Sequence, residues 1–146
     1  MSVLSNLLNF LGLSKRRVFI SYDHSEDVRY RNLLSAWDAN SAFEFEFNQC
    51  SPSVAINSKR AAVIKRSLTR MMKKSDYLLV IVGEKTHTSK WVNWEINRAK
   101  RSDVDLKLVA VKLDKLYKTP TGLLNAGTSF AYSFTEKAII QALKDA

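Results

Sequence analysis

Glycine is scarce in this chain, and its scarcity argues against three kinds of site. Only four of the 146 residues are glycine. They form neither the G-x-G-x-x-G pattern of dinucleotide-binding loops nor the G-x-x-x-x-G-K-[ST] pattern of triphosphate-binding loops. The G-x-S-x-G turn that presents the nucleophile of α/β-hydrolases is also missing. A function that depends on a glycine-rich phosphate loop or on that serine nucleophile is therefore unsupported.

Cysteine and long apolar runs are also rare. Cys50 is the single cysteine, which excludes an internal disulfide and fits the reducing conditions of the cytoplasm. No apolar run approaches the roughly 20 residues that span a bilayer. The first residues lack the basic region and the small-residue cleavage site of a signal peptide. We therefore expect a cytoplasmic protein without a membrane span.

Negative charge is in short supply. The chain has 23 Lys and Arg residues against 14 Asp and Glu residues, a formal charge of +9. This surplus of positive charge indicates an anionic partner, which could be nucleic acid, a membrane surface or a phosphate-bearing small molecule. Seven cations fall within residues 59–74, which is more than solubility requires, so this segment is a candidate contact for a partner subunit or nucleic acid. Nucleic acid is the least favoured, because no aromatic residues alternate with these cations.

The chain is predicted to consist of a short N-terminal arm and one domain. Residues 1–14 carry leucines with the i, i+3, i+4, i+7 spacing of an amphipathic helix, namely Leu4, Leu7, Leu8 and Leu11. The polar side of this helix lacks Lys and Arg, so we favour packing on the domain or on a second subunit over membrane contact. Residues 15–146 have a length that suits one domain with a substantial core.

Apolar strands and amphipathic helices alternate along the domain. Strands are predicted at residues 16–22, 43–47, 77–83, 106–113 and 130–134. Helices are predicted at 23–39, 57–74 and 91–102 and after residue 135, and residues 117–127 are predicted to be irregular. In the first helix, the buried residues are predicted to be Tyr30, Leu33, Leu34 and Trp37. Capping boxes are predicted for the first and last helices, from Asp23 with Glu26 and from Ser133 with Glu136.

This alternation predicts an α/β fold, a flavodoxin-like, doubly wound, five-stranded parallel sheet with helices on both faces. The segment Phe43–Phe47 alternates apolar and charged residues, so it is predicted to be an edge strand, which favours the strand order 2-1-3-4-5. The loops 22–27 and 84–89 should then face each other across the carboxyl edge of the sheet. His24 and His87 lie in these two loops, and Cys50 should lie at the same edge.

A carboxylate and an indole are predicted to lie together at this edge. The apolar run Tyr77–Gly83 reads as a strand buried on both faces. Trp91 and Glu95 follow it, four residues apart and therefore neighbours on one side of a helix. Open α/β sheets bind their ligands at this edge. From spacing alone, however, a surface carboxylate favoured by the helix dipole is the commoner explanation of Glu95.

Three other chemistries fit this edge poorly. His24, His87 and Cys50 lack the close spacing of metal ligands, so no metal site is predicted. A phosphoacceptor receiver domain needs an aspartate at the end of the third strand, where Val82-Gly-Glu stands. Flavin binding needs a Ser/Thr/Gly-rich loop after the first strand, where carboxylates stand instead.

Three segments together resemble the TIR-like domains of bacteria, most closely the TIR-like group of Thoeris anti-phage systems. They are Val-Phe-Ile-Ser-Tyr ending at Tyr22, Leu-Val-Ile-Val-Gly ending at Gly83, and Ser-Lys-Trp-Val-Asn-Trp-Glu ending at Glu95. The resemblance covers about residues 15–146. Many TIR domains have cysteine where Val92 stands, but that cysteine is not the catalytic group.

The resemblance implies that NAD⁺ is a substrate, that the nicotinamide–ribose bond is cleaved, and that a cyclic ADP-ribose-type signal is formed and sensed by a separate effector protein. It implies Glu95 as the catalytic residue, no additional cofactor and a homo-oligomeric state. Substrate contacts are expected from Tyr22, Asp23, His24, Ser25, Ser89 and Trp91. Tyr22 and Trp91 would stack on the nicotinamide or the adenine ring, and His24 and Ser25 would hydrogen-bond ribose or phosphate.

Two questions stay open at the level of sequence. The first is the protonation state of Glu95, because the helix N-terminus favours the ionised form and burial against Trp91 disfavours it. The second is whether the chain is an enzyme at all. The alternative is a non-enzymatic TIR-like signalling module that acts by self-association or partner binding.

Overall fold

A computed structural model describes residues 16–38, 45–49 and 55–146 of the chain. The predicted N-terminal arm of residues 1–14 and the position of Cys50 lie outside these described residues. None of the helices in the described ranges combines the length and the apolar character needed to cross a bilayer.

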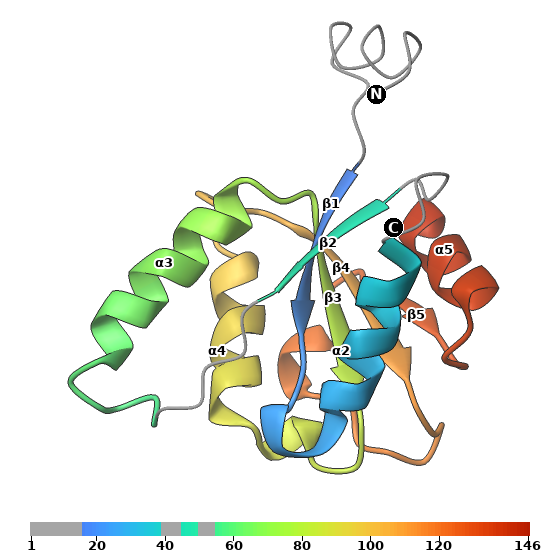
Figure 1. Cartoon of the computed structure of the whole chain (residues 1–146), viewed down its shortest axis with the longest axis horizontal. Helices are drawn as coiled ribbons and strands as arrows, with labels where there is room; N and C mark the ends of the chain where they lie inside the picture. The colour runs from blue at the N-terminus through green and yellow to red at the C-terminus, as the bar shows by residue number, and fades with distance from the viewer. Residues whose placement is uncertain (1–15, 39–44, 50–54) are drawn as a thin grey trace, which may run out of the picture.

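The described strands form one five-stranded parallel sheet (Figure 1). The strands are β1 (Arg16–Ser21), β2 (Phe45–Gln49), β3 (Tyr77–Val82), β4 (Lys107–Lys112) and β5 (Ser129–Ala131). Their order is β2-β1-β3-β4-β5, which confirms the predicted doubly wound topology. The edge position of β2 is confirmed as well. Its Phe45 and Phe47 are buried, whereas the side chain of Glu46 is 44% exposed beside Arg17.

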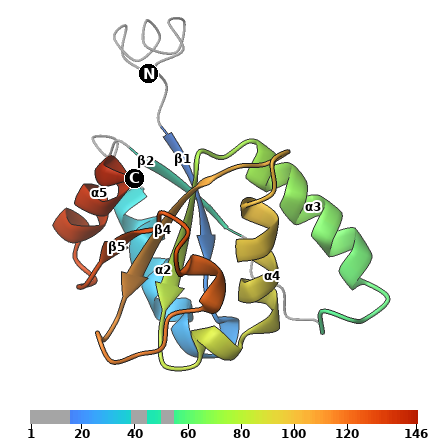
Figure 2. The same ribbon diagram turned by 180° about the vertical axis from the view of Figure 1, so that it is seen from behind.

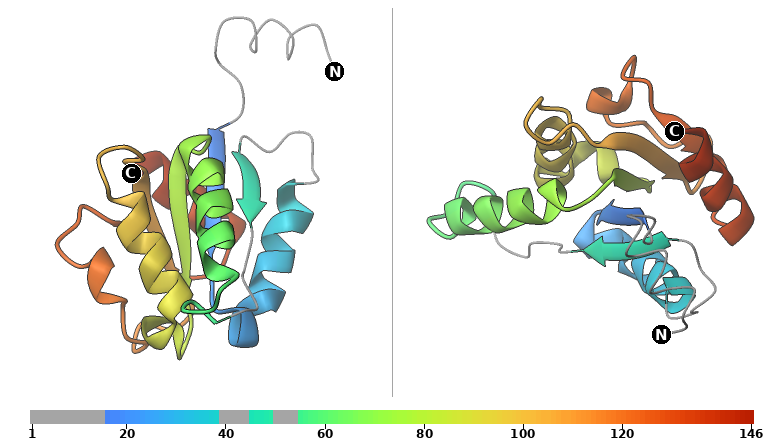
Figure 3. Two further views of the ribbon diagram at one scale, coloured as in Figure 1. Left: turned by 90° about the vertical axis from the view of Figure 1, so that its left-hand side faces the viewer. Right: turned by 90° about the horizontal axis from the view of Figure 1, so that it is seen from above.

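Four α-helices in the described ranges cover both faces of the sheet (Figures 1 and 2). They are α2 (His24–Asp38), α3 (Ala61–Lys73), α4 (Lys90–Ala99) and α5 (Glu136–Asp145), and two short 3₁₀ helices are η1 (Thr86–Thr88) and η2 (Thr121–Leu123). Helices α2 and α5 share a core with one face of the sheet, and α3 and α4 share a core with the other. Figure 3 shows the sheet between these two helical layers.

Strand β3 supplies both cores. All six of its residues are buried. Tyr77, Leu79 and Ile81 belong to the core beneath α2 and α5, and the alternate residues Leu78, Val80 and Val82 belong to the core beneath α3 and α4. This is the pattern expected of a central parallel strand, whose successive side chains point to opposite faces.

Two predictions about the helices need correction. Leu33 was predicted to be buried but is 47% exposed, and Leu34 alone of that adjacent pair is fully buried. The capping box of the last helix is also wrong. Its N-cap is Thr135, whose hydroxyl accepts the backbone N–H of Ala138 at 3.2 Å. The apolar stripe specifies which side of a helix is buried, but not its start to within one or two residues.

The first helix has only half of its predicted capping box. The carboxylate of Asp23 accepts the backbone N–H of Ser25 at 3.1 Å and the hydroxyl of Ser25 at 2.8 Å. Glu26 instead forms an ion pair with Lys85 at 3.5 Å. The side chain of Glu26 therefore links the first helix to the loop after β3.

The corrected cap of α5 can be tested with two alanine variants. We expect Thr135→Ala to lower the free energy of unfolding by about 1 kcal/mol, because a backbone N–H in the first turn loses its acceptor. Ser133→Ala should change it by less than about 0.5 kcal/mol, because Ser133 is exposed and lies outside the helix. Urea denaturation of both variants measures the difference. A larger cost for Ser133→Ala would contradict the assigned cap.

Candidate functional site

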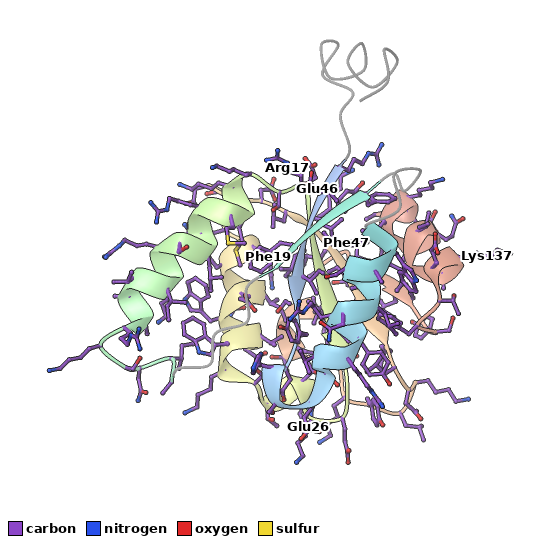
Figure 4. All side chains as sticks on the ribbon, viewed as in Figure 1. Arg17, Phe19, Glu26, Glu46, Phe47 and Lys137 are labelled. Atoms are coloured by element: carbon purple, nitrogen blue, oxygen red, sulfur yellow. The ribbon has the colours of Figure 1, made fainter. Side chains whose placement is uncertain are left out.

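The carboxyl edge of the sheet brings together the two predicted loops, those after β1 and β3. Besides the pair of Glu26 with Lys85, the hydroxyl of Thr86 donates to the carboxylate of Asp27 at 3.2 Å. Thr86 also accepts the backbone N–H of Gly83 at 2.8 Å. Figure 4 shows the labelled Glu26 at this edge. The predicted juxtaposition of the two loops is therefore confirmed.

Gly83 allows α2 to approach the end of β3. A Cβ atom at this position would lie 2.5 Å from each carboxylate oxygen of Asp27. Asp27 is only 4% exposed. Burial raises the pKa of its carboxyl to about 6, the Thr86 hydrogen bond lowers it, and the charges of Asp23 and Glu26 raise it. A buried carboxyl with a raised pKa at a ligand-binding edge is a feature that sequence reasoning missed.

Helix α4 is held at its start by hydrogen bonds from the preceding loop. The hydroxyl of Ser89 accepts the backbone N–H of Val92 at 3.2 Å. The amide of Asn93 donates to the carbonyls of Ser89 at 2.9 Å and His87 at 3.0 Å. Ser89, expected to contact substrate, thus serves as the N-cap of the helix that carries Glu95.

Glu95 is buried and is hydrogen-bonded to Ser21 of β1. It is 2% exposed, and its Oε1 accepts the hydroxyl of Ser21 at 2.8 Å. Its other carboxyl oxygen, Oε2, is buried without a hydrogen-bond partner among the described residues. Burial raises the pKa of the Glu95 carboxyl from 4.5 to about 8, against the opposing effect of the Ser21 hydrogen bond. Desolvation prevails, and Glu95 is mainly protonated at pH 7.

The two predicted stacking residues lie on opposite faces of the sheet. Trp91 packs against the core beneath α3 and α4, with its ring centroid 5.9 Å from that of Trp94 and nearly perpendicular to it. Tyr22 is 4% exposed and belongs to the core beneath α2 and α5. Since the sheet separates the two rings, they do not form one aromatic sandwich. Only Trp91 lies on the same face of the sheet as Glu95.

The remaining predicted contacts are at the start of α2. His24 and Ser25 are exposed, and the ring centroid of His24 lies 6.3 Å from that of Tyr22. Asp23 is occupied in capping the helix. These side chains lie at the carboxyl edge, where a ligand would contact them. Among the described residues, no hydrogen bond joins them to Glu95.

Ser21 is the second functional candidate that sequence reasoning missed. It is fully buried at the end of β1, directly after the buried apolar residues Val18, Phe19 and Ile20. A hydroxyl at such a position needs a partner, and it finds one in Glu95, 74 positions further along the chain. The polar residue within Val-Phe-Ile-Ser-Tyr was the available signal, although nothing local to it named the partner.

A small polar cavity also opens at the carboxyl edge, lined by residues of α2 and of the loops after β3 and β4, and not by Glu95. Its volume is about 220 Å³, and its lining includes Asp27, Tyr30, Gly83, Asp114 and Tyr117. Within the ranges that the structure describes, no three His, Cys, Asp or Glu side chains gather as metal ligands would.

Residues 19–118 match the family described as Thoeris protein ThsB, TIR-like domain. This segment begins within β1, extends beyond β4, and includes both Ser21 and Glu95. No curated protein matches the chain.

The raised pKa of Glu95 predicts a pH-dependent stability. Between pH 4.5 and about 8 the folded protein holds a proton that the unfolded chain has released. The free energy of unfolding should therefore fall as the pH rises through this window, by about 1.4 kcal/mol per unit for this group. Glu95→Gln cannot ionise, so its stability relative to the wild type should increase from pH 5 to pH 8. Urea denaturation across this range tests it, and parallel stability curves would contradict the raised pKa.

Proposed function

Since the chain belongs to the TIR-like domain family of the Thoeris protein ThsB, we propose that it cleaves the nicotinamide–ribose bond of NAD⁺. The product that we propose is a cyclic ADP-ribose-type signal, sensed by a separate effector protein. Family membership supports a context of anti-phage defence.

The observation that carries this proposal is the buried Glu95 carboxyl with one unpartnered oxygen. A buried polar atom without a hydrogen bond costs stability, and such groups are retained where they act on a ligand. Ser21 donates a hydrogen bond to Oε1 of Glu95, whereas Oε2 has no hydrogen-bond partner among the described residues. A strongly raised pKa beside the ligand edge of an α/β sheet is a second mark of a functional carboxyl.

The substrate itself provides the means to ionise Glu95. The nicotinamide ring of NAD⁺ is a cation, and an adjacent positive charge lowers the pKa of a carboxyl. Glu95 is thus an acid in the empty site and becomes a carboxylate when the cationic ring is bound. The hydroxyl of Ser21, already within 2.8 Å of Oε1, stabilises the ionised form by donating to it.

In the proposed reaction the bond between ribose C1′ and the nicotinamide nitrogen breaks. The electron pair leaves with the nitrogen, which makes nicotinamide neutral, and positive charge develops on the ribose. A carboxylate held beside that centre stabilises the oxocarbenium-like transition state. Water, or a nucleophilic atom of the ADP-ribose itself, then bonds to C1′ and loses a proton. The second course gives the cyclic product.

Access to Glu95 requires movement of the side chains that cover it. At 2% exposure, the carboxyl is out of reach of a ligand at the surface. We propose that Trp91 forms one wall of the opened site and that His24 and Ser25, exposed at the start of α2, contact ribose or phosphate. Ser89 and Asp23 contribute by fixing the starts of α4 and α2.

The catalytic role is tested by nicotinamide release from NAD⁺. We expect Glu95→Gln to lower kcat/KM by at least about 100-fold, since the amide cannot supply the negative charge. Glu136→Gln, which removes an exposed carboxylate from α5, is the matched control and should retain activity. Nucleotide extracts of phage-infected cells carrying each variant extend the test to triggered activity. Equal product from wild type and Glu95→Gln, or defence that survives the substitution, would favour the non-enzymatic alternative.

The role of Ser21 is tested by the pH dependence of kcat/KM. Because its hydrogen bond lowers the pKa of Glu95, Ser21→Ala should raise that pKa further. We therefore expect the rising limb of the profile to move to higher pH, by about one unit, while the rate at high pH stays near that of the wild type. A uniform loss of rate at every pH would contradict this positioning role.

A further inference from the structure

A cationic groove lies between α3 and α4, away from the Glu95 carboxyl. Its volume is about 480 Å³, within the roughly 300–1,000 Å³ of sites for small molecules. Its lining consists of Lys65, Arg66, Thr69 and Arg70 from α3, and Trp94, Arg98 and Arg101 from α4 and the turn after it. Figure 1 shows α3 and α4, which lie on the same face of the sheet and border the groove. Five of the seven lining residues are cations, and no carboxylate lines the groove.

The cations of the groove differ in how they are occupied. Arg98 donates two hydrogen bonds of 2.7 Å to Asp103, holding the pKa of that carboxyl well below its usual range. Asp103 also lies 3.7 Å from Lys73. For Arg66, Arg70 and Arg101, no ion pair or side-chain hydrogen bond exists within the described part of the chain. Three guanidinium groups therefore remain available for an anion, and guanidinium binds phosphate oxygens in a bidentate manner.

The groove also contains an aromatic ring. Trp94 is half-buried, and the ammonium of Lys65 lies 5.7 Å from the centroid of its ring, a cation–π contact. The ring of Trp94 also makes an edge-to-face contact with the ring of Trp91. Lysine has a long flexible side chain, so a planar ligand can displace the ammonium from the ring and stack there, while Lys65 turns to the ligand's phosphate.

We infer that this groove binds a nucleoside phosphate, with its base on Trp94 and its phosphates on Arg66, Arg70 and Arg101. The site is separate from the proposed catalytic carboxyl, because Glu95 points into the sheet toward Ser21 whereas Trp94 lines the surface groove. It does not depend on the cleavage of NAD⁺. A base without phosphate would leave the guanidinium groups unused, and phosphate without a base would leave the indole unused.

A single nucleotide fits these observations better than a nucleic-acid strand does. Strand-binding surfaces present a row of aromatic side chains for successive bases along a basic track. Helix α3, with the sequence AAVIKRSLTRMMK, contributes cations but no aromatic residue. The groove thus offers one stacking platform and one cluster of free cations, which is the complement of one base and its phosphates.

The test is isothermal titration of the full-length protein with ADP, which has no nicotinamide and is not consumed. We expect saturable binding, weakened at least about tenfold in Arg66→Gln/Arg70→Gln, because charge-assisted hydrogen bonds to phosphate are lost. The matched control is Lys118→Gln/Lys137→Gln, which removes the same charge elsewhere. Figure 4 shows Lys137 on α5, on the opposite side of the molecule from α3. An equal loss in the control would overturn the site in favour of general electrostatic attraction.

Further ligands and variants test the remaining parts of the inference. Trp94→Phe keeps a ring in the groove and should weaken ADP binding by about threefold to tenfold, whereas inorganic phosphate should bind at least tenfold more weakly than ADP. Phosphate binding as tightly as ADP would overturn the role of the indole. An oligothymidylate that binds through Arg66 and Arg70 where ADP does not would assign the groove to nucleic acid instead. Absence of any ADP binding would also overturn the inference.

The result of the ADP-binding experiment does not depend on whether the protein cleaves NAD⁺. ADP binding should be unchanged in Glu95→Gln, and nicotinamide release from NAD⁺ should persist in Arg66→Gln/Arg70→Gln. Loss of ADP binding in Glu95→Gln, with the arginine variants unaffected, would place the nucleotide at the carboxyl edge and overturn the groove as its site.

Discussion

Burial of β3 on both faces is the constraint from which the arrangement of the molecule follows. A strand of six apolar residues cannot face water on either side, so one pair of helices covers each face. Parallel connections then return every crossover to the same end of the sheet, and the loops after β1 and β3 meet at its carboxyl edge. The contact between Asp27 and Thr86 and the contact between Ser21 and Glu95 both form at this edge, on opposite sides of the sheet.

The sequence was sufficient for the topology because periodicity and burial act locally. An unbroken apolar run, an alternating run at one edge and amphipathic helices between them specified five parallel strands in the observed order. Glu95 was identified as the candidate carboxyl because its spacing from Trp91 placed it near the edge, and the TIR-like resemblance singled it out. The fold was therefore predictable without coordinates, whereas the catalytic role of Glu95 stays a prediction.

The details that failed are those set by tertiary contacts. Nothing near Ser21 in the sequence names Glu95 as its partner, and nothing near Asp27 indicates that Gly83 makes room for it. The sequence also does not show that Tyr22 and Trp91 lie on opposite faces of the sheet, because that separation follows from the alternation of β1 and the position of α4. Thr135 and Ser133 are both good caps, and only the final position of α5 decides between them. The pKa of Glu95 depends on desolvation, which spacing does not measure.

The burial of Glu95 also changes the electrical bookkeeping of the whole molecule. The formal charge of +9 counts every Asp and Glu as ionised. With a pKa of about 8, Glu95 is mostly neutral at pH 7, so the empty protein is more positive than its formal charge by nearly one unit. If a cationic ligand ionises this carboxyl, the ligand's charge is cancelled inside the protein and a proton is released to the solvent. The charges of the cationic ring and the carboxylate then cancel, and only the phosphates of a dinucleotide ligand change the net charge of the molecule.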